Sequence, residues 1–258
     1  MRPNRIPTAS LAELFPGVED DLPLTVSSYL FKFRPDQMPV LLPHEQLVLA
    51  ALIRHVKPAK LLEFGTAAGH TTFLLAANSP ASAQVFTLDL APTDRGDYTL
   101  QSMLGDTRIG QCFLGKPEGA KIRQLFRAAG ERMTDDLARV GPFFDYIHVD
   151  ADHGYAGVKA DSEVALAMIS QDSIVTWHDF YAFPSYVAQP PETRGVYPYL
   201  NELAQEGTIV LRHIAGTFLV VGCKAWRDDA TPGVLFQPGD VAAPFGAMNV
   251  RLAQAGWK

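Results

Sequence analysis

Acidic and histidine side chains follow several of the strands that the sequence predicts. Asp89 and Asp150 each end a short apolar run, and the pair His178-Asp179 follows a third. In an open sheet of parallel strands, ligands bind outside the carboxyl ends of the strands. An Asp after a strand often caps the next helix instead. Capping explains any one of these residues well but all of them together less well, so we predict a binding site at this edge.

A loop with two glycines lies at the same edge of the predicted sheet. The run EFGTAAGHTT at residues 63–72 starts where a predicted strand ends and leads into a predicted helix. Gly65 and Gly69 allow a tight turn and a close approach to a ligand, and the first N–H groups of the helix can bind an anion. Ala67 and His70 stand where a dinucleotide fingerprint has glycines, and a histidine would crowd a pyrophosphate. The loop therefore disfavours NAD and FAD and fits a carboxylate better.

Asp89 strengthens this interpretation because of its distance from the loop along the chain. It lies 20 residues beyond Gly69 and follows the next predicted strand. A carboxylate at this place can accept hydrogen bonds from both hydroxyls of a ribose. The loop and Asp89 together predict a ligand that carries both a ribose and a carboxylate.

Strands that alternate with helices would place these residues at one edge, and the sequence predicts such an order. The pattern indicates an α/β fold with a Rossmann-like, doubly wound, mostly parallel seven-stranded sheet. The last two strands have too short a link for a parallel crossover, so they must pair antiparallel or lie apart. The strands are expected at residues 60–64, 84–88, 121–126, 144–149, 173–177, 208–212 and 217–222, and the helices at 43–55, 71–77, 155–169 and 195–205.

Composition and charge narrow the class of protein. The chain has 258 residues, is 47% hydrophobic and carries a net charge of −6, which excludes a disordered protein and argues against a general nucleic-acid binder. Two cysteines are too few for a disulfide scaffold. No secretory signal begins the chain, and no apolar run approaches the ~20 residues of a membrane span. We therefore expect a cytoplasmic protein with no membrane and no nucleic-acid partner.

The chain divides into three predicted parts. Residues 1–42 form an N-terminal extension or cap, residues 43–223 the ligand-binding domain, and residues 224–258 a peripheral C-terminal tail. The length and short apolar pieces of the extension make it a candidate lid or homo-oligomer contact. Residues 91–119 and 181–194 fit neither strand nor helix. Such long loops are often lids or binding loops, and for residues 91–119 an ordinary surface loop explains the pattern equally well.

Three stretches resemble one enzyme family. The run at residues 63–72 resembles motif I of the class I S-adenosylmethionine (SAM) methyltransferases. The run FDYIHVDADHGYAGVKAD at residues 144–161 is similar to the fourth-strand motif of a branch of small-molecule O-methyltransferases that includes macrolide-sugar and other natural-product enzymes, and VTWHDF at residues 175–180 matches its fifth-strand motif. The resemblance spans about residues 43–222. It implies methyl transfer from SAM to a hydroxyl of a small molecule and leaves the acceptor unspecified.

The resemblance also implies how SAM would be held. The glycine loop would flank the methionine part, Glu63 would position the loop, and Asp89 would hold the ribose. Adenine would lie near residues 127–130, where this chain has Arg-Ala-Ala-Gly in place of the acid common in the family, so Glu131 is only a substitute candidate. The cofactor-binding residues implied are Glu63, Gly65, Thr66, Ala67, Gly69 and Asp89.

Related enzymes bind a divalent metal ion at the ends of the fourth and fifth strands. By position, the resemblance assigns Asp150, His178 and Asp179 to this site. Carboxylates suit Mg²⁺, whereas an imidazole suits Mn²⁺ or another transition metal better. Three alternatives stay open: a metal other than Mg²⁺, a His178 that faces the acceptor, or a site that no longer binds metal.

The acceptor hydroxyl also needs a general base. His153, three residues beyond Asp150, has a side chain whose ordinary pKa suits proton transfer, and some relatives have a histidine at this offset. Others use an acid at the position of Asp152. Aromatic residues after the fifth strand are candidates for the acceptor pocket: Tyr181, Phe183 and Tyr186. His148, inside a predicted strand, is expected to be a core residue.

Two rival functions belong to other classes. A metal-independent SAM enzyme, such as an N-methyltransferase, would keep the glycine loop and Asp89 but would need no metal. A non-catalytic binding protein could share the fold, since fold does not determine function. A mere scaffold would have no reason to hold the acids and histidines at residues 150–153 and 178–179, which favours an enzyme.

Overall fold

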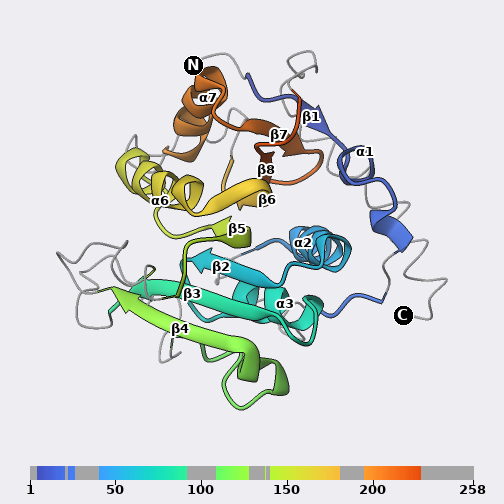
Figure 1. The fold of residues 1–258 in the computed structure, drawn as a ribbon, viewed down its shortest axis with the longest axis vertical. Helices are drawn as coiled ribbons and strands as arrows, with labels where there is room; N and C mark the ends of the chain where they lie inside the picture. Colours follow the sequence, from blue (N-terminus) through green and yellow to red (C-terminus); the bar gives the residue numbers. More distant parts are fainter. Residues whose placement is uncertain are drawn as a thin grey trace.

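The computed structural model describes residues 5–20, 23–26, 41–91, 109–127, 137, 140–180 and 195–227. Within these ranges, eight strands form one sheet in the order β1-β7-β8-β6-β5-β2-β3-β4 (Figure 1). The strands are β1 (Thr8–Ala9), β2 (Lys60–Phe64), β3 (Gln84–Leu90), β4 (Ile122–Arg127), β5 (Phe144–Val149), β6 (Ile169–Trp177), β7 (Val210–Ile214) and β8 (Val220–Cys223). The helices are α1 (Leu11–Leu14), η1 (Val18–Asp20), α2 (Pro43–Val56), α3 (His70–Asn78), η3 (Pro117–Lys121), α6 (Tyr155–Ala167) and α7 (Val196–Glu206).

The pairing of the strands confirms the predicted α/β fold. β2 pairs in parallel with β3 and with β5, β3 with β4, and β5 with β6, whereas β8 lies antiparallel to both β6 and β7. From β2 the chain proceeds to β3 and β4 on one side of the sheet, and β5 and β6 lie on the other. The order of strands therefore reverses between β2 and β5, and ligands of open α/β sheets bind outside the carboxyl ends of strands at such a point.

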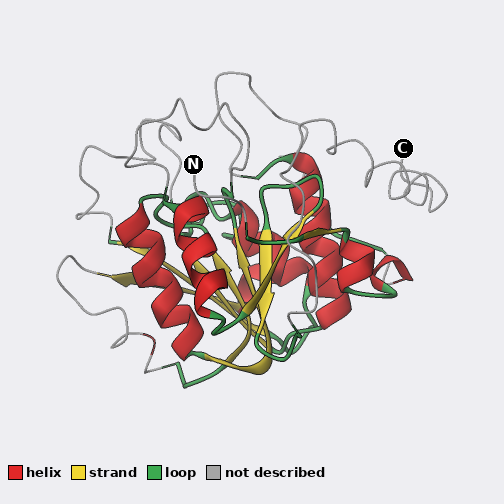
Figure 2. Cartoon of the chain, turned by 90° about the horizontal axis from the view of Figure 1, so that it is seen from above, coloured by secondary structure: helices red, strands yellow, loops and turns green. Residues whose placement is uncertain are grey.

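Helices cover both faces of the sheet (Figure 2). Side chains of one strand alternate between the two sides, so Leu62 and Phe64 lie in a core with α6 and α7, whereas Leu61 lies in a second core with α2 and α3. Trp177 at the end of β6 is fully buried, and its indole N–H donates to Ser162 Oγ of α6 at 2.8 Å. This packing on both faces fixes the strand ends that carry the polar residues.

Several bounds differ by a few residues from the sequence prediction, and three differences have a structural explanation. The helix predicted to run to residue 169 ends at Ala167, because the Met168 carbonyl accepts the N–H of Phe144 at 2.9 Å and draws the chain into β6. β3 extends past residue 88, so Asp89 lies within the strand, opposite Phe126 of β4. An eighth strand, β1, pairs with β7; two residues are too few to show the alternation by which a strand is recognised.

Parts of the predicted extension and tail pack against the central domain. Phe15 and Val18 belong to the core under α2, and the Phe15 ring lies 5.7 Å from the ring of Trp226. The domain boundaries at residues 42 and 223 stay predictions. Across the described ranges, every helix is too short or too polar to span a bilayer.

Candidate functional site

The glycine loop packs directly against the end of β5. Gly65 has a φ of +95°, and a Cβ at this position would collide with the backbone of Asp150 and Ala151. The Gly65 N–H donates to the Leu88 carbonyl at 2.8 Å, and the Asp150 N–H donates to the Phe64 carbonyl at 2.9 Å. The glycine loop, where SAM was expected, therefore touches the loop after β5, where a metal ion was expected. The two backbones meet at Gly65 and leave no room for a side chain there.

Asp89 shapes the glycine loop from the neighbouring strand. Its Oδ2 accepts the N–H groups of Thr66 at 3.1 Å and Ala67 at 3.0 Å, and Ala67 has a positive φ of 46°. Its Oδ1 accepts the N–H of Leu90 at 2.7 Å. The half-buried carboxylate thus lies at the loop, where the ribose of a nucleoside ligand was expected.

A second segment covers the other end of the loop. The N–H groups of Gly110 and Cys112 donate to loop carbonyls at 2.9 Å each, and the Phe113 ring occupies the space beside Gly69. The Cys112 Sγ lies 3.3 Å from His70 Nε2. The described end of the long excursion at residues 91–119 is therefore packed onto the glycine loop.

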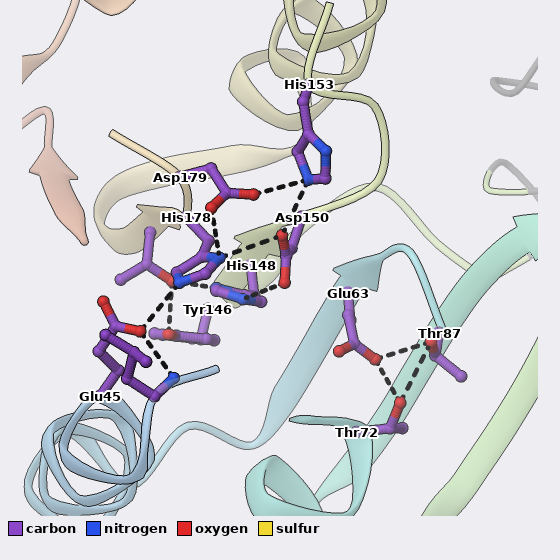
Figure 3. Close-up of polar contacts among 12 residues, drawn as sticks. Glu45, Glu63, Thr72, Thr87, Tyr146, His148, Asp150, His153, His178 and Asp179 are labelled. Carbon is purple, nitrogen blue, oxygen red and sulfur yellow. Dashed lines mark hydrogen bonds and ion pairs between the residues drawn. The ribbon is translucent and has the colours of Figure 1, made fainter. Parts of the chain in front are cut away.

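Glu63 is enclosed beneath the loop and supports it. Its carboxyl accepts hydrogen bonds from the hydroxyls of Thr72 and, at 2.8 Å, Thr87, as Figure 3 shows. Burial raises the pKa of Glu63 to about 8, against the opposing effect of the two threonine hydrogen bonds. The side chain is 1% exposed, so it holds the loop and the start of α3 from within the protein.

The raised pKa of Glu63 predicts a pH-dependent stability. Folded protein keeps this proton up to about pH 8, whereas the unfolded chain releases it near 4.5. The folded state binds more protons in this window, so the free energy of unfolding falls as pH rises, by at most about 1.4 kcal/mol per pH unit from this group. Glu63→Gln cannot ionise and should show a flatter decline in urea unfolding measured across the window. Parallel curves for the two proteins would contradict the assignment.

Three polar residues, Asp150, His153 and Asp179, meet at the ends of β5 and β6. His153 Nε2 lies 2.8 Å from Asp179 Oδ2 and 3.6 Å from Asp150 Oδ1. Asp150, His153 and Asp179 each offer one ligand atom, and these atoms lie within 4.8 Å of one another. The carboxylates are nearly buried while His153 is half exposed. This cluster has the donor types and spacing of a metal site that is open on the His153 side.

His178 lies behind this cluster, between it and α2. Its Nδ1 is 3.4 Å from Asp150 Oδ1 and 3.5 Å from Asp179 Oδ1, and its Nε2 is 3.1 Å from Glu45 Oε2 (Figure 3). Within the described part of the chain, Nδ1 is buried and makes no hydrogen bond of good geometry. A buried ring nitrogen that points at two carboxylates is what a cation between them would use.

Backbone strain accompanies Asp179. It has a φ of +59°, in the left-handed region that residues with a Cβ rarely adopt. The neighbouring backbone is held firmly, since the His178 N–H donates to the Val149 carbonyl and the Phe180 N–H to the Phe218 carbonyl. Strain of this kind persists only where surrounding structure imposes it, and it gathers at functional sites.

The charges of the cluster favour an additional cation. Burial raises the pKa of Asp150, but His178 and hydrogen bonds from neighbouring histidines outweigh it and hold the pKa well below its usual value. Burial lowers the pKa of His178, but the surrounding carboxylates raise it well above its usual value. Hydrogen bonds and charges from Asp150 and Asp179 likewise overcome burial and raise the pKa of His153 to about 10. Carboxylates thus dominate the site, and protons supply the positive charge that a metal ion would otherwise bring.

Asp152 contacts the start of α6. Its Oδ1 accepts the N–H of Gly154 at 2.7 Å, and its carboxylate lies so close to Gly157 that a Cβ there would collide with it. These contacts are those of a residue that shapes the start of α6. The predicted acceptor residues Tyr181, Phe183 and Tyr186, and the adenine candidate Glu131, lie outside the described residues.

Sequence reasoning missed Glu45, which lies in the first turn of α2 and is fully buried. The only signal was its place two residues after Pro43 at a helix start, which is ordinary for an acid. His148 is buried as expected, with Nδ1 2.8 Å from Thr176 Oγ1. Its Nε2 lies 3.8 Å from Asp150 Oδ2, so it borders the cluster as well.

Comparisons with known proteins agree with this fold. Residues 62–180, somewhat less than half of the chain, match the family described as Methyltransferase domain. No curated protein sequence matches significantly. Similar solved structures include the O-methyltransferase from Bacillus cereus in complex with SAH, with 16% identity, a TM-score of 0.52, and coverage of 82% of this chain and 99% of that chain.

Two further structures have the same overall fold. The O-methyltransferase TomG from Streptomyces achromogenes, involved in tomaymycin synthesis and solved with SAM, shares 17% identity with a TM-score of 0.51, covering 82% of this chain and 97% of its own. Cofactor-bound Rv0187 from MTB shares 14% identity with a TM-score of 0.52, covering 84% and 90%. At such identities the likeness concerns the fold. The match at residues 62–180 and the fold together identify a methyltransferase with the fold of the SAM-dependent O-methyltransferases.

Proposed function

We propose that this enzyme transfers the methyl group of SAM to a hydroxyl of a small molecule with the help of a divalent metal ion. The observation that carries the proposal is the pair of buried carboxylates, Asp150 and Asp179, beside two imidazoles and next to the glycine loop. The similarity of fold to O-methyltransferases, TomG among them, supports a hydroxyl acceptor.

The glycine loop and Asp89 would hold the cofactor. Gly69 has no side chain with which to cap α3, so the N–H groups at the helix start suit the carboxylate of SAM. Asp89, already fixed by two loop N–H groups, has further lone pairs for ribose hydroxyls. Glu63 would keep the loop in this shape from below.

Asp150, Asp179 and His178 would hold the metal ion, with His153 at its open side. The Nδ1 of His178 fits this set, because it is buried and lies 3.4 Å from Asp150 Oδ1 and 3.5 Å from Asp179 Oδ1 without a hydrogen bond of good geometry. Two carboxylates with imidazole favour Mn²⁺, while Mg²⁺ remains compatible with the oxygen donors. When bound, the ion would supply positive charge that lowers the pKa of the acceptor hydroxyl and displaces the protons now shared among the imidazoles.

The chain itself would align the reactants and move one proton. The methyl transfer is an in-line displacement, so alignment of the hydroxyl oxygen with the methyl carbon supplies much of the rate. His153, half exposed beside both carboxylates, would take the hydroxyl proton at Nε2 once its own proton has been displaced. Asp150 and Asp179 would then stabilise the imidazolium that forms.

Calorimetric titration tests the proposed function. We expect SAM and SAH, but not NAD, to bind the purified protein, and Mn²⁺ to bind a site that EDTA empties. Methylation of hydroxyl compounds in a panel of phenols and sugars should then depend on the metal. Absence of SAM and SAH binding would overturn the cofactor assignment, and full turnover in EDTA would overturn the role of the metal.

The two candidates for the base predict different variants. His153→Ala should lower kcat by about 10²- to 10⁴-fold, the usual contribution of a general base. Asp152→Ala should have a much smaller effect, because that carboxylate is engaged at the start of α6. Initial rates with the first active acceptor from the panel would measure both. The reverse order of effects would transfer the role of base to Asp152.

A further inference from the structure

We propose that Glu45 is a positioning residue for the metal site, which holds the Nε2 edge of His178 so that Nδ1 faces the space between Asp150 and Asp179. This inference rests on the metal-assisted function proposed above. Glu45 would act on the metal site only through the imidazole of His178. It lies in α2, which precedes the residues 62–180 that match the methyltransferase family.

The carboxylate of Glu45 is itself fixed on both oxygens. Oε1 accepts the N–H of Phe218 at 2.6 Å, and Oε2 accepts the N–H of Leu42 at 2.9 Å as well as facing His178 Nε2 at 3.1 Å. Two backbone donors, one from the start of α2 and one from the connection between β7 and β8, thus prevent the group from turning away. Since the side chain is fully buried, a move away from these partners would leave a buried charge without hydrogen bonds, which is unfavourable.

This contact determines which nitrogen of His178 can bind a cation. An ionised carboxylate has no hydrogen, so His178 Nε2 must carry the one shared with Glu45. In a neutral imidazole the lone pair then lies on Nδ1, 3.4 Å from Asp150 Oδ1 and 3.5 Å from Asp179 Oδ1. Histidines that bind metals commonly donate their other N–H to a carboxylate, which fixes the tautomer and the ring orientation.

The surroundings of Nδ1 are a second observation, which does not depend on Glu45. Nδ1 is one of a few buried side-chain atoms in the described residues that make no hydrogen bond, although it lies among carboxylates. A capping role alone would not require Glu45 to contact the ring of His178. A positioning role accounts both for the contact at Nε2 and for Nδ1 facing the two carboxylates.

Binding of Mn²⁺, measured from the electron paramagnetic resonance signal of the free ion, tests the inference without turnover. Glu45→Gln should weaken Mn²⁺ binding by about 10- to 100-fold, the usual effect of losing such a partner, and should leave SAM affinity unchanged. Glu45→Asp keeps the charge but withdraws the carboxylate from the ring, so it should weaken Mn²⁺ binding too. Glu13→Gln is the matched control, because Glu13 has the same capping place in α1 and is far from His178 in the sequence.

A double-mutant cycle separates positioning from a general loss of stability. In a His178→Asn background, Glu45→Gln should cause no further loss of Mn²⁺ affinity, because its effect passes through the imidazole. Additive losses, or Mn²⁺ affinity in both Glu45 variants equal to that of the Glu13→Gln control, would overturn the inference.

The same measurements distinguish failure of the metal-assisted function from failure of the positioning role of Glu45. If the unmodified protein and Asp150→Asn bind Mn²⁺ equally, or neither binds it, the metal-assisted function fails, and the inference on Glu45 fails with it. If Asp150→Asn loses Mn²⁺ while the Glu45 variants retain it, only the inference on Glu45 fails.

Discussion

Asp150→Asn should abolish tight Mn²⁺ binding and lower kcat/KM by at least about a hundredfold, because a bound metal ion contributes several kcal/mol to stabilising the transition state. The carboxylate of Asp150 faces three imidazoles, with Oδ1 toward His153 and His178 and Oδ2 toward His148. An amide removes one full negative charge from the centre of this group and offers a weaker donor to the metal.

The same variant should also be less stable. Removal of one partner from a buried ion pair costs about 3–5 kcal/mol when the other charge stays buried, and His178 would stay so. Thermal unfolding and SAM binding therefore need to be measured beside Mn²⁺ binding. Asp152→Asn is the matched control: it lies two residues away, is exposed, and can still cap the start of α6. Asp150→Asn protein that binds Mn²⁺ like this control would refute the site.

Gly65→Ala is the second change with a large expected effect, and it should weaken SAM and Mn²⁺ binding together. Its positive φ alone makes alanine unfavourable by about 1 kcal/mol. In addition, the new methyl group would displace the backbone at Asp150 and Ala151, and Asp150 is a proposed ligand of the metal ion. Because the loop and the strand end are in direct contact, one substitution should disturb both ligands.

Gly207→Ala separates the two effects of Gly65→Ala, which are the unfavourable positive φ and the collision with the backbone of Asp150 and Ala151. Gly207 also has a positive φ, +68°, but nothing lies within 4 Å of a Cβ placed there. It should therefore lower the melting temperature only slightly and leave SAM and Mn²⁺ binding intact. Calorimetry on both variants provides the comparison. Equal melting temperatures and equal affinities would show that the contact between Gly65 and Asp150 has no functional weight.

Much of the candidate site followed from local patterns. Apolar runs that end in Asp or in His-Asp predicted strands with polar residues at their carboxyl ends, and parallel strands bring those ends to one edge. Asp150 follows one such run and His178-Asp179 follows another, and the resemblance to a methyltransferase family, not the runs alone, assigned them to one metal site. The glycine loop was recognisable because a positive φ such as that of Gly65 favours glycine at a tight turn, whereas the close approach of Asp150 and Ala151 to Gly65 could not be seen in the sequence.

Local sequence patterns did not reveal in which direction a side chain points or which distant segments pair with one another. Asp152 and His153 are neighbours in the sequence, but Asp152 faces the start of α6 whereas His153 faces Asp179. The beginning of β6 depended on pairing with Phe144, which overrode helical spacing at Met168.

The sequence by itself determined the alternating α/β order, the polar strand ends and the glycine loop, because strand period, glycine conformation and apolar runs act over a few residues. Only the tertiary structure decided that Glu45, 133 residues before His178, lies against its ring. A buried carboxylate at a helix start looks like any capping acid until the sheet brings a distant imidazole to it. The partners of buried charges depend on packing in three dimensions, and no spacing along the chain records them.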